Sequence, residues 1–321
     1  MPVLEEAVSR LSEIANLNLL PAALLSRYTR FGLGGPADIF VETRSESSFI
    51  RALQVIRRNH WPFVVIGGGT NLIVSDEGFR GIVLRLTACE ITNANALVRV
   101  DAGVELQHLV DYTAARGLKG LETLTGIPGW VGAAVYGNAG AYGHSMMERV
   151  HQVRFFDGDQ VCTFSNSQCE FSYRESVFKW RKDWVIFSVD LVMDKAPSDE
   201  LQHTAAGILK VRNEKYPPTM KCAGSIFKNL LLRDLPSTAR DAVPPAVVRE
   251  GKVPSAWFLE QVGAKGMQAG GIHVADYHAN LIYNAGDGTA AELVRLIEIL
   301  KARVYERFTL RLEEEVQYVG F

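Results

Sequence analysis

The chain has 321 residues, which exceeds the length at which single hydrophobic cores usually stop growing, so we expect two or three packed units. With 47% hydrophobic residues, 22% charged residues and a formal net charge of −2, the composition is that of an ordinary globular protein. Because this charge creates no strong electrostatic field, we expect neither a nucleic-acid partner nor a membrane partner.

The cysteines and the N-terminal segment indicate where the protein works. The four cysteines are scattered and form no C-x-x-C pair, which predicts reduced thiols rather than a disulfide framework. Glu5 and Glu6 stand where a signal peptide would carry basic residues, and no apolar run approaches the roughly 20 residues of a membrane span. We therefore expect a cytoplasmic protein.

The first predicted elements are a helix and a strand. Thr43 and Glu46 have the spacing of a capping box, which predicts a helix that ends before Pro62. Its buried face should carry Phe49, Leu53 and Ile56. The short apolar run from Pro62 to Ile66 then predicts a buried strand.

A glycine-rich loop follows this strand, with the sequence Gly67-Gly68-Gly69-Thr70-Asn71. A Rossmann fingerprint would open a helix here, but the continuation LIVSDEGFRGIVLRL indicates a strand, a turn and a strand. A P-loop is excluded too, because no Gly-Lys-Ser/Thr follows the glycines. Two interpretations stay open: a tight turn, or backbone N–H groups that converge on an anion.

A second helix is expected over residues 105–116, and Gly117 just past its end suits a helix C-terminus. Its inward face consists of Leu106, Leu109, Val110 and Thr113. From Gly126 to Gly143, ten of eighteen residues are Gly or Ala, too many for a segment that fills a core with bulk. Such a segment permits close backbone approach to a large flat ligand. Two side-chain-poor loops together predict a long cofactor.

The last third of the chain contains the clearest helix. Strand-like segments continue to about Met193, and residues 196–200 are interpreted as a linker. Thr289 and Glu292 then form a capping box for a helix whose buried stripe is Leu293, Leu296, Ile297, Leu300 and Val304. A final strand should follow, with Leu310, Leu312, Val316 and Tyr318 on one face.

Six ordered motifs resemble the UDP-N-acetylenolpyruvoylglucosamine reductases, usually called MurB. The motifs are TRFGLGGPAD at 29–38, VIGGGTNLIVSDEGFRG at 65–81, GIPGWVGAAVYGNAGAYG at 126–143, FSYRESVFK at 171–179, AGSIFKN at 223–229 and LEEEV at 312–316. Any one of them would be weak, but six in order are specific.

This resemblance implies an α+β flavoprotein with a two-part FAD-binding domain of the vanillyl-alcohol-oxidase (PCMH) type and a separate α+β substrate-binding domain. We expect the first FAD subdomain at 1–85, joined by a C-terminal strand at about 310–321. The second subdomain is expected at 86–203 and the substrate domain at 204–309. The family's reaction uses NADPH and non-covalent FAD to reduce UDP-N-acetylglucosamine enolpyruvate to UDP-N-acetylmuramate in peptidoglycan precursor synthesis. We expect a monomer.

The resemblance also implies the site residues. The cofactor contacts would be Gly67, Gly68, Gly69, Thr70, Asn71, Gly126, Ile127, Pro128, Gly132, Ala133, Asn138, Gly140 and Ala141. The substrate contacts would be Tyr142, Tyr173, Lys215, Asn229 and His278.

Three catalytic roles follow from the family's motifs. Hydride addition to an α,β-unsaturated carboxylate pushes charge toward the carboxylate, so the site must stabilise an enolate and then protonate its α-carbon. Arg174 matches the cation beside the carboxylate, Ser225 the proton donor, and Glu315 the acid beside the intermediate. Without the motifs, a surface salt bridge, a turn serine and a solvated strand face would be simpler interpretations. Parity alone does not choose Glu315 over Glu313.

The chain departs from the family in places. Leu230 replaces the proline that usually follows the Phe-Lys-Asn motif, and His278 stands where some members have glutamine. The 50 residues between Arg174 and Ser225 resemble the branch that lacks an inserted loop whose tyrosine covers the substrate.

Two rival functions stay open at this point. One is a flavin oxidase of the same cofactor fold, many of which tether the flavin through His or Cys. The other is a non-catalytic sugar-nucleotide sensor that kept the pocket. A metal hydrolase is not supported, because the seven histidines show no ligand spacing.

Overall fold

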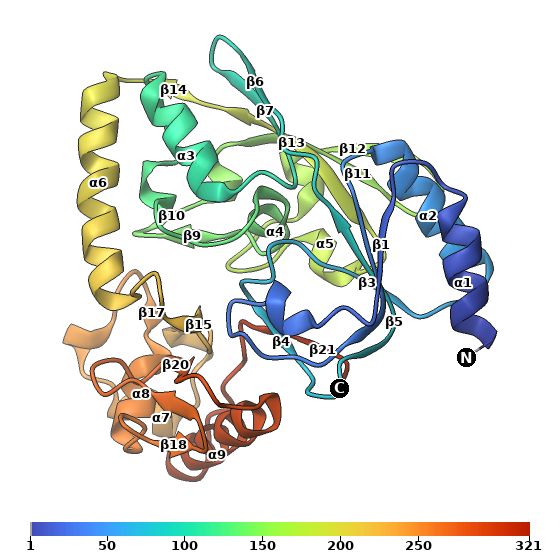
Figure 1. Cartoon of the computed structure of the whole chain (residues 1–321). Helices are drawn as coiled ribbons and strands as arrows, with labels where there is room; N and C mark the ends of the chain where they lie inside the picture. Colours follow the sequence, from blue (N-terminus) through green and yellow to red (C-terminus); the bar gives the residue numbers. More distant parts are fainter. Residues whose placement is uncertain (1) are drawn as a thin grey trace. The chain divides into compact units, whose positions relative to one another are not determined.

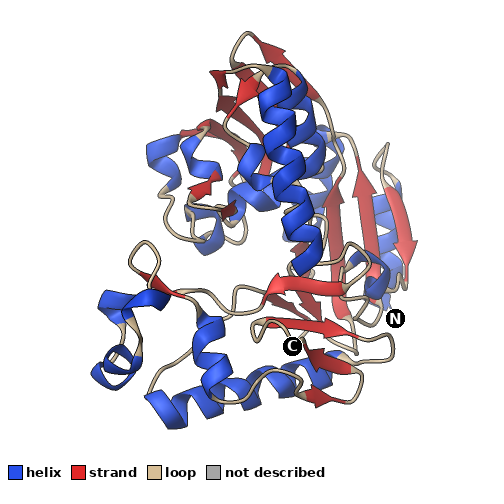
Figure 2. Ribbon diagram, turned by 90° about the vertical axis from the view of Figure 1, so that its left-hand side faces the viewer, coloured by secondary structure: helices blue, strands red, loops and turns tan. Residues whose placement is uncertain are grey.

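A computed structural model describes residues 2–321 and divides them into two compact units. Unit 1 contains the segment up to Ala23, Ala37–Gly69 and Arg80–Pro218, and unit 2 contains Leu24–Pro36, Thr70–Phe79 and Thr219–Phe321. Each unit mixes helices and strands (Figure 2), which agrees with the predicted α+β class. Within the described residues, no helix combines the length and hydrophobicity needed to cross a bilayer.

The first part of unit 1 is a four-stranded sheet in the order β1-β2-β5-β3. Its strands are β1 (Asn18–Pro21), β2 (Ala37–Thr43), β5 (Phe79–Leu86) and β3 (Phe63–Val65). Helices α1 (Pro2–Ser12) and α2 (Glu46–Arg58) lie side by side against this sheet (Figure 1). Their apolar faces and the sheet share one core, which includes Leu11, Ile39, Phe49, Leu53 and Ile82.

Helix α2 buries the face that the sequence predicts, since Phe49, Leu53 and Ile56 are fully buried, but its predicted cap is wrong. Ser45 is the N-cap, and its Oγ accepts from the Ser48 N–H at 3.2 Å. Thr43 instead ends β2, and its Oγ accepts from the Ser45 N–H at 3.0 Å. Ser45 rather than Thr43 caps the helix because β2 extends through Thr43, which leaves Ser45 as the hydroxyl residue next to the helix.

The predicted strand after α2 is also present, as β3, but it is half-buried rather than buried. The reason is its place at the edge of the sheet, where it pairs in parallel with β5 alone. The strand, turn and strand predicted after the glycine loop are β4 (Leu72–Val74) and β5.

The second part of unit 1 is a five-stranded antiparallel sheet in the order β12-β11-β13-β7-β6. Its strands are β12 (Val161–Ser165), β11 (Val150–Phe156), β13 (Val185–Val192), β7 (Leu97–Asp101) and β6 (Ile91–Ala94). The helices of this part are α3 (Leu106–Ala115), α4 (Val131–Tyr136), α5 (Val177–Trp180) and α6 (Ser198–Lys215). This part also contains two short strand pairs. In one, β8 (Leu118–Lys119) pairs with β14 (Asp194–Lys195), and in the other, β9 (Gly140–Ala141) pairs with β10 (His144–Ser145).

Helix α3 confirms the predicted second helix, with its inward residues buried and Gly117 at φ +64 just past its end. It runs beside α6 (Figure 1). The predicted linker at 196–200 is wrong, because α6 begins at Ser198. Asp199 and Glu200 occupy its first turn, where carboxylates interact favourably with the positive end of the helix dipole.

A buried carboxylate ties the five-stranded sheet together and gives a first prediction. Asp190 accepts two hydrogen bonds from Arg99, at 2.7 and 2.8 Å, and one from Gln152 at 2.7 Å. The Arg99 guanidinium lowers the pKa of the Asp190 carboxyl below its ordinary value. This carboxylate therefore contributes stability above about pH 3.9, and the contribution is lost as the pH falls through the lower folded pKa.

We expect Asp190→Asn to lower the free energy of unfolding by about 2 kcal/mol at pH 7, and the difference from the original chain to shrink as the pH falls toward about 3. Urea unfolding across that range measures it. Asp194→Asn is the matched control, because Asp194 pairs with Arg149 from an exposed position, and it should cost less than about 1 kcal/mol. A loss for Asp190→Asn that stays the same at both ends of the pH range would contradict this account.

Unit 2 is built on a four-stranded antiparallel sheet in the order β15-β20-β19-β18. Its strands are β15 (Lys221–Ser225), β20 (Leu281–Asn284), β19 (Ile272–Val274) and β18 (Gln268–Ala269). The helices are α7 (Ser237–Ala242), α8 (Ser255–Gln261) and α9 (Ala290–Phe308), and β16 (Leu230–Leu231) pairs with β17 (Lys252–Val253).

Helix α9 confirms the clearest prediction of the sequence. Thr289 and Glu292 form the predicted capping box, and the predicted stripe is fully buried. The Asp76 carboxylate adds two bonds, from the Ala290 and Ala291 N–H groups at 2.8 and 2.9 Å. The turn between β4 and β5 therefore holds the start of this helix.

The end of the chain is partly as predicted. Strand β21 (Gln317–Val319) pairs in parallel with β4, and Leu310, Leu312 and Val316 are buried. The prediction for Tyr318 is wrong, because its side chain is exposed and Val319 is buried instead. The backbone bends at residues 315–316, which shifts the alternation by one residue.

Candidate functional site

The two predicted glycine loops lie side by side in unit 1. A Cβ atom added at Gly68 would lie 3.1 Å from Cδ1 of Trp130 and 3.5 Å from the Gly129 Cα. One added at Gly67 would lie 3.7 Å from the Cβ of Ala133. Ala133 itself is exposed beside this contact. Residues far apart in the sequence thus approach closely because Gly67 and Gly68 carry no side chain where Trp130 and Ala133 pack.

The first loop offers hydrogen-bond donors. Gly69 has φ +65, a conformation that glycine adopts without steric cost. Across residues 2–321, no carbonyl or side-chain oxygen accepts a hydrogen bond from the N–H groups of Gly67, Gly68 or Gly69. Successive N–H groups in a turn form the kind of concavity that binds phosphate. The loop therefore fits the diphosphate of a dinucleotide cofactor.

The loop continues into unit 2 with Thr70 and Asn71. The Asn71 side chain donates to the Glu315 carbonyl at 2.9 Å, and the Asn71 carbonyl accepts from the Gln317 N–H at 2.9 Å. These bonds place the end of the loop beside the predicted acid of the C-terminal motif.

In the second loop, several glycines allow backbone to pack on backbone. A Cβ at Gly132 would lie 2.7 Å from the Cβ of Ala102, and one at Gly140 would lie 2.4 Å from the His144 carbonyl oxygen. Gly126 has φ +74, and its N–H donates to Gln107 Oε1 at 2.7 Å. These positions require glycine for the fold itself. Ile127 packs against the core, whereas Pro128 is exposed and Ala141 is half-buried.

Arg174 lies against this second loop. Its guanidinium donates to the Gly140 carbonyl at 2.7 Å, and its backbone has φ +60, an uncommon conformation for a residue with a side chain. The buried Asn138 side chain donates to the Ser172 carbonyl at 2.7 Å and accepts from the Met147 N–H at 3.0 Å. Ser176 Oγ donates to the Tyr136 carbonyl at 2.7 Å. The segment that carries Arg174 is therefore fastened to the loop on both sides of the arginine.

Ser225 and Glu315 come together in unit 2. Ser225 ends β15 after a β-bulge and pairs with Leu281. The next residue, Ile226, accepts through its carbonyl from the Glu315 N–H at 2.7 Å. The predicted proton donor and the predicted acid therefore lie on adjacent backbone segments that hydrogen-bond to each other.

The three consecutive glutamates have different surroundings. Glu313 is exposed and pairs with Lys228, and Glu314 pairs with Lys301 at 2.9 Å. Glu315 is half-buried beside the bend. The three residues therefore differ in burial and in the segments beside them, which strand parity alone does not reveal.

The predicted substrate residues occupy both units. Tyr142 is exposed at φ +53 in the turn between β9 and β10, and Tyr173 lies beneath the Arg174 guanidinium, 5.1 Å from its ring centroid. Lys215 ends α6. In unit 2, Asn229 Oδ1 accepts from the Ser255 N–H at 3.4 Å, and His278 Nδ1 accepts from the Asn280 N–H at 3.2 Å.

Sequence reasoning missed Trp130, a residue of the second loop that packs against the first. Its indole contacts Gly68, and the Arg85 guanidinium lies 4.3 Å from its ring centroid. Arg85 is itself held by Glu42 at 3.1 Å. The signal available in the sequence was a tryptophan in a window of mostly small residues. Sequence reasoning also missed Asn280, a polar residue directly before the apolar start of β20.

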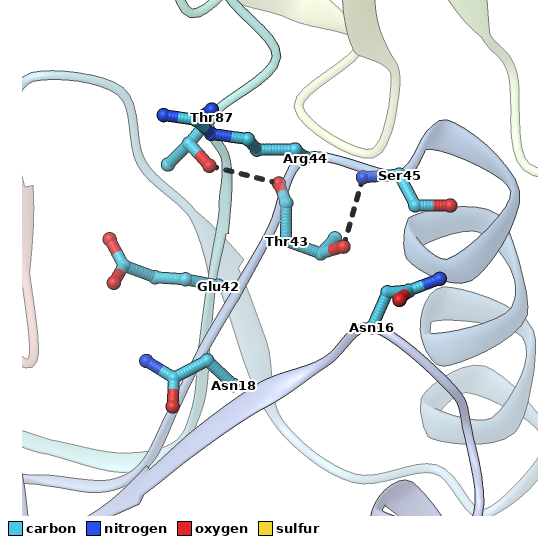
Figure 3. A pocket seen from close by; sticks show the side chains of 7 residues that line it. All are labelled: Asn16, Asn18, Glu42, Thr43, Arg44, Ser45 and Thr87. Carbon is cyan, nitrogen blue, oxygen red and sulfur yellow. Dashed lines mark hydrogen bonds between the residues drawn. The ribbon is translucent and has the colours of Figure 1, made fainter.

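A separate pocket of unit 1 does not involve the predicted site residues (Figure 3). It has a volume of about 620 Å³ and is lined by Asn16, Asn18, Glu42, Thr43, Arg44, Ser45 and Thr87. Its hydroxyl groups bond to neighbouring backbone: Thr87 Oγ donates to the Thr43 carbonyl at 3.2 Å, and Thr43 Oγ accepts from Ser45. The bonds of Thr43 and Ser45 stabilise the start of α2, and we assign this pocket no ligand.

Comparison with known families supports the interpretation of the loops. Residues 37–162, which include both loops up to Ala141, match the FAD binding domain family. The paired side-chain-poor loops and this match define an FAD-binding protein of the α+β class.

The particular family follows from the rest of the chain. Residues 216–319 match the C-terminal domain of UDP-N-acetylenolpyruvoylglucosamine reductase. The chain is 63% identical over 311 residues to the UDP-N-acetylenolpyruvoylglucosamine reductase of Solibacter usitatus, covering 97% of this chain and 100% of that one. The reductase of Anoxybacillus flavithermus is 34% identical over 92% of each chain. The chain therefore belongs to the UDP-N-acetylenolpyruvoylglucosamine reductase family, as its motifs predict.

A solved structure agrees with this assignment. The crystal structure of UDP-N-acetylenolpyruvylglucosamine reductase (MurB) from Thermus caldophilus superposes with a TM-score of 0.72 at 28% identity. It covers 95% of this chain and 99% of its own.

Proposed function

We propose that this chain uses NADPH and non-covalent FAD to reduce UDP-N-acetylglucosamine enolpyruvate to UDP-N-acetylmuramate, a step of peptidoglycan precursor synthesis. The single observation that carries the proposal is the 63% identity to a UDP-N-acetylenolpyruvoylglucosamine reductase across nearly the whole of both chains. The paired glycine loops support the same conclusion independently, because their geometry suits a dinucleotide cofactor.

FAD would be held by the loop of Gly67 to Asn71 and by the segment from Gly126 to Ala141. When bound, FAD supplies a carrier that accepts hydride from NADPH and passes it to the substrate. The N–H groups of the first loop would bind the diphosphate. The small residues of the second loop would let the flat rings approach the backbone closely.

Arg174 would bind the carboxylate of the enolpyruvyl group and stabilise the charge that develops on it. Its planar guanidinium suits a carboxylate better than an ammonium group does. Two observations support this role: the arginine sits on the cofactor loop through its bond to Gly140, and its left-handed backbone is a costly conformation of the kind found at functional sites.

Ser225 would then donate a proton to the α-carbon of the enolate, and Glu315 would act as the acid beside the intermediate. A serine hydroxyl is a weak acid, but an enolate carbon is strongly basic, and neighbouring groups can share the transient charge. Support comes from the hydrogen bond between Ile226 and Glu315, which joins the two backbone segments.

Lys215 would meet the diphosphate of the sugar nucleotide, and Tyr142, Tyr173, Asn229 and His278 would line the rest of the substrate site. We also propose a cytoplasmic monomer. The division into FAD subdomains at 1–85 with 310–321 and at 86–203, and a substrate domain at 204–309, is part of the same proposal.

Anaerobic absorbance spectroscopy tests the function. The purified protein should be yellow, release FAD on acid precipitation, bleach when NADPH is added, and recover its colour with the enolpyruvyl sugar nucleotide. Two results would favour a flavin oxidase: yellow colour that stays on the acid-precipitated protein, and a reduced flavin that is reoxidised by oxygen but not by the sugar nucleotide. Binding of the sugar nucleotide without any bleaching by NADPH would favour a sensor.

A further inference from the structure

The backbone segment Ile226–Lys228, just after Ser225, is held along one edge by the C-terminal segment. The Ile226 carbonyl accepts from the Glu315 N–H at 2.7 Å, and the Lys228 N–H donates to the Glu313 carbonyl at 2.9 Å. These two bonds set the register between the serine and the glutamate.

The other edge of the segment is held mainly by Asn280. Its Oδ1 accepts from the Phe227 N–H at 2.9 Å, and its Nδ2 donates to the Phe227 carbonyl at 2.9 Å. The carboxamide thus bonds both polar groups of one residue, as a neighbouring strand would. The Asn280 carbonyl adds a third bond, from the Ile226 N–H at 3.1 Å.

Asn280 is itself locked in place. It is 2% exposed, and its Nδ2 also donates to Ser255 Oγ at 2.8 Å. Ser255 is fully buried, and its Oγ donates to the Phe227 carbonyl at 3.2 Å. Buried polar networks in which every member has a partner are rigid, and Asn280 has no room to adopt another rotamer without breaking several bonds.

We propose that Asn280 is a positioning residue of the proton-transfer site, which fixes Ser225 relative to Glu315. It acts through the backbone of Phe227 and Ile226 and does not touch the substrate. The Asn280 N–H also bonds His278 Nδ1 at 3.2 Å, so the same residue orients a second predicted substrate contact. The proposal rests on the proposed function, because it concerns the step in which Ser225 and Glu315 act.

The test compares two buried asparagines at the two ends of β20. Asn280→Asp removes the Nδ2 donor to Phe227 and Ser255 while it keeps the shape of the side chain. Asn284→Asp is the matched control: Asn284 is 5% exposed, and its Nδ2 donates to the Phe31 carbonyl at 3.0 Å, in a different part of unit 2. Each substitution therefore removes a buried amide donor, which makes two hydrogen bonds at Asn280 and one at Asn284.

Stopped-flow absorbance should show that Asn280→Asp slows flavin reoxidation by the enolpyruvyl sugar nucleotide by roughly 10–100-fold, because small misplacements of a proton donor are costly. Flavin reduction by NADPH, and the dissociation constant for FAD measured on the apoprotein, should stay within about twofold. Asn284→Asp should leave both half-reactions within about threefold even where its melting temperature falls. Equal slowing of reoxidation by the two variants, or equal slowing of both half-reactions by Asn280→Asp, would overturn the proposal.

Ser255→Ala provides a second, milder variant in case Asn280→Asp does not fold. It removes one partner of Asn280 and the Ser255 bond to the Phe227 carbonyl, but it keeps both bonds between Asn280 and Phe227, so reoxidation alone should slow, by roughly 3–10-fold. An unchanged reoxidation rate in this variant would count against the proposal. The original chain distinguishes failure of the proposed function from failure of the role proposed for Asn280. If its reduced flavin is not reoxidised by the sugar nucleotide at all, the proposed function is wrong, whatever the variants do.

Discussion

Ser225→Ala should slow the reoxidation of the reduced enzyme by the enolpyruvyl sugar nucleotide by roughly 10²–10⁴-fold, the range typical for loss of a general acid. Reduction by NADPH should stay within about twofold, because hydride transfer to the flavin requires no proton at the substrate's α-carbon. The serine ends β15 on a bulge and is followed by a segment bonded on both edges, so removing one oxygen should change the chemistry and leave the fold intact.

Stopped-flow absorbance of the two half-reactions measures this effect. Ser237→Ala, at an exposed position at the start of α7 in the same unit, is the control and should behave as the original chain. Equal losses in both half-reactions of Ser225→Ala would show that the serine supports the cofactor or the fold rather than proton transfer.

Glu315→Gln should slow the same half-reaction by roughly 10²-fold or more, since glutamine can hydrogen-bond but cannot supply an acidic proton. The Glu315 backbone bond to Ile226 survives the substitution, so the register of the two segments is retained. Reduction by NADPH should again change little.

The neighbouring glutamates provide controls that differ only in position. Glu313→Gln weakens a salt bridge between an exposed carboxylate and Lys228, and Glu314→Gln weakens a partly buried one to Lys301. Neither glutamate has a role in the proposed reaction, so both variants should retain their half-reaction rates within about threefold. If Glu313→Gln slowed flavin reoxidation as much as Glu315→Gln does, the role assigned to Glu315 would be wrong.

Local patterns in the sequence were sufficient to predict the helices with strong periodicity or clear end signals. Helix α9 matches its prediction in cap and buried stripe, and α3 does so in both ends and face. Both depend on interactions within a few residues of chain, which a sequence displays directly. The errors lie where neighbours compete or the backbone bends: Ser45 replaced Thr43 as a cap, and a bend at 315–316 exposed Tyr318.

The motifs of the sequence by themselves determined the family and named the candidate residues, because their order and spacing are properties of the chain alone. Tertiary structure decided which of these residues meet. Trp130 packs against Gly68, about sixty residues before it in the chain, and Asn280 bonds a segment 53 residues before it. Neither contact leaves a periodic signal, since a long-range hydrogen bond or a packed ring depends on where the chain returns in space. Glu315 also depends on tertiary structure. Its neighbours in the sequence are glutamates too, and what sets it beside the predicted proton donor is the bond from its N–H to the Ile226 carbonyl.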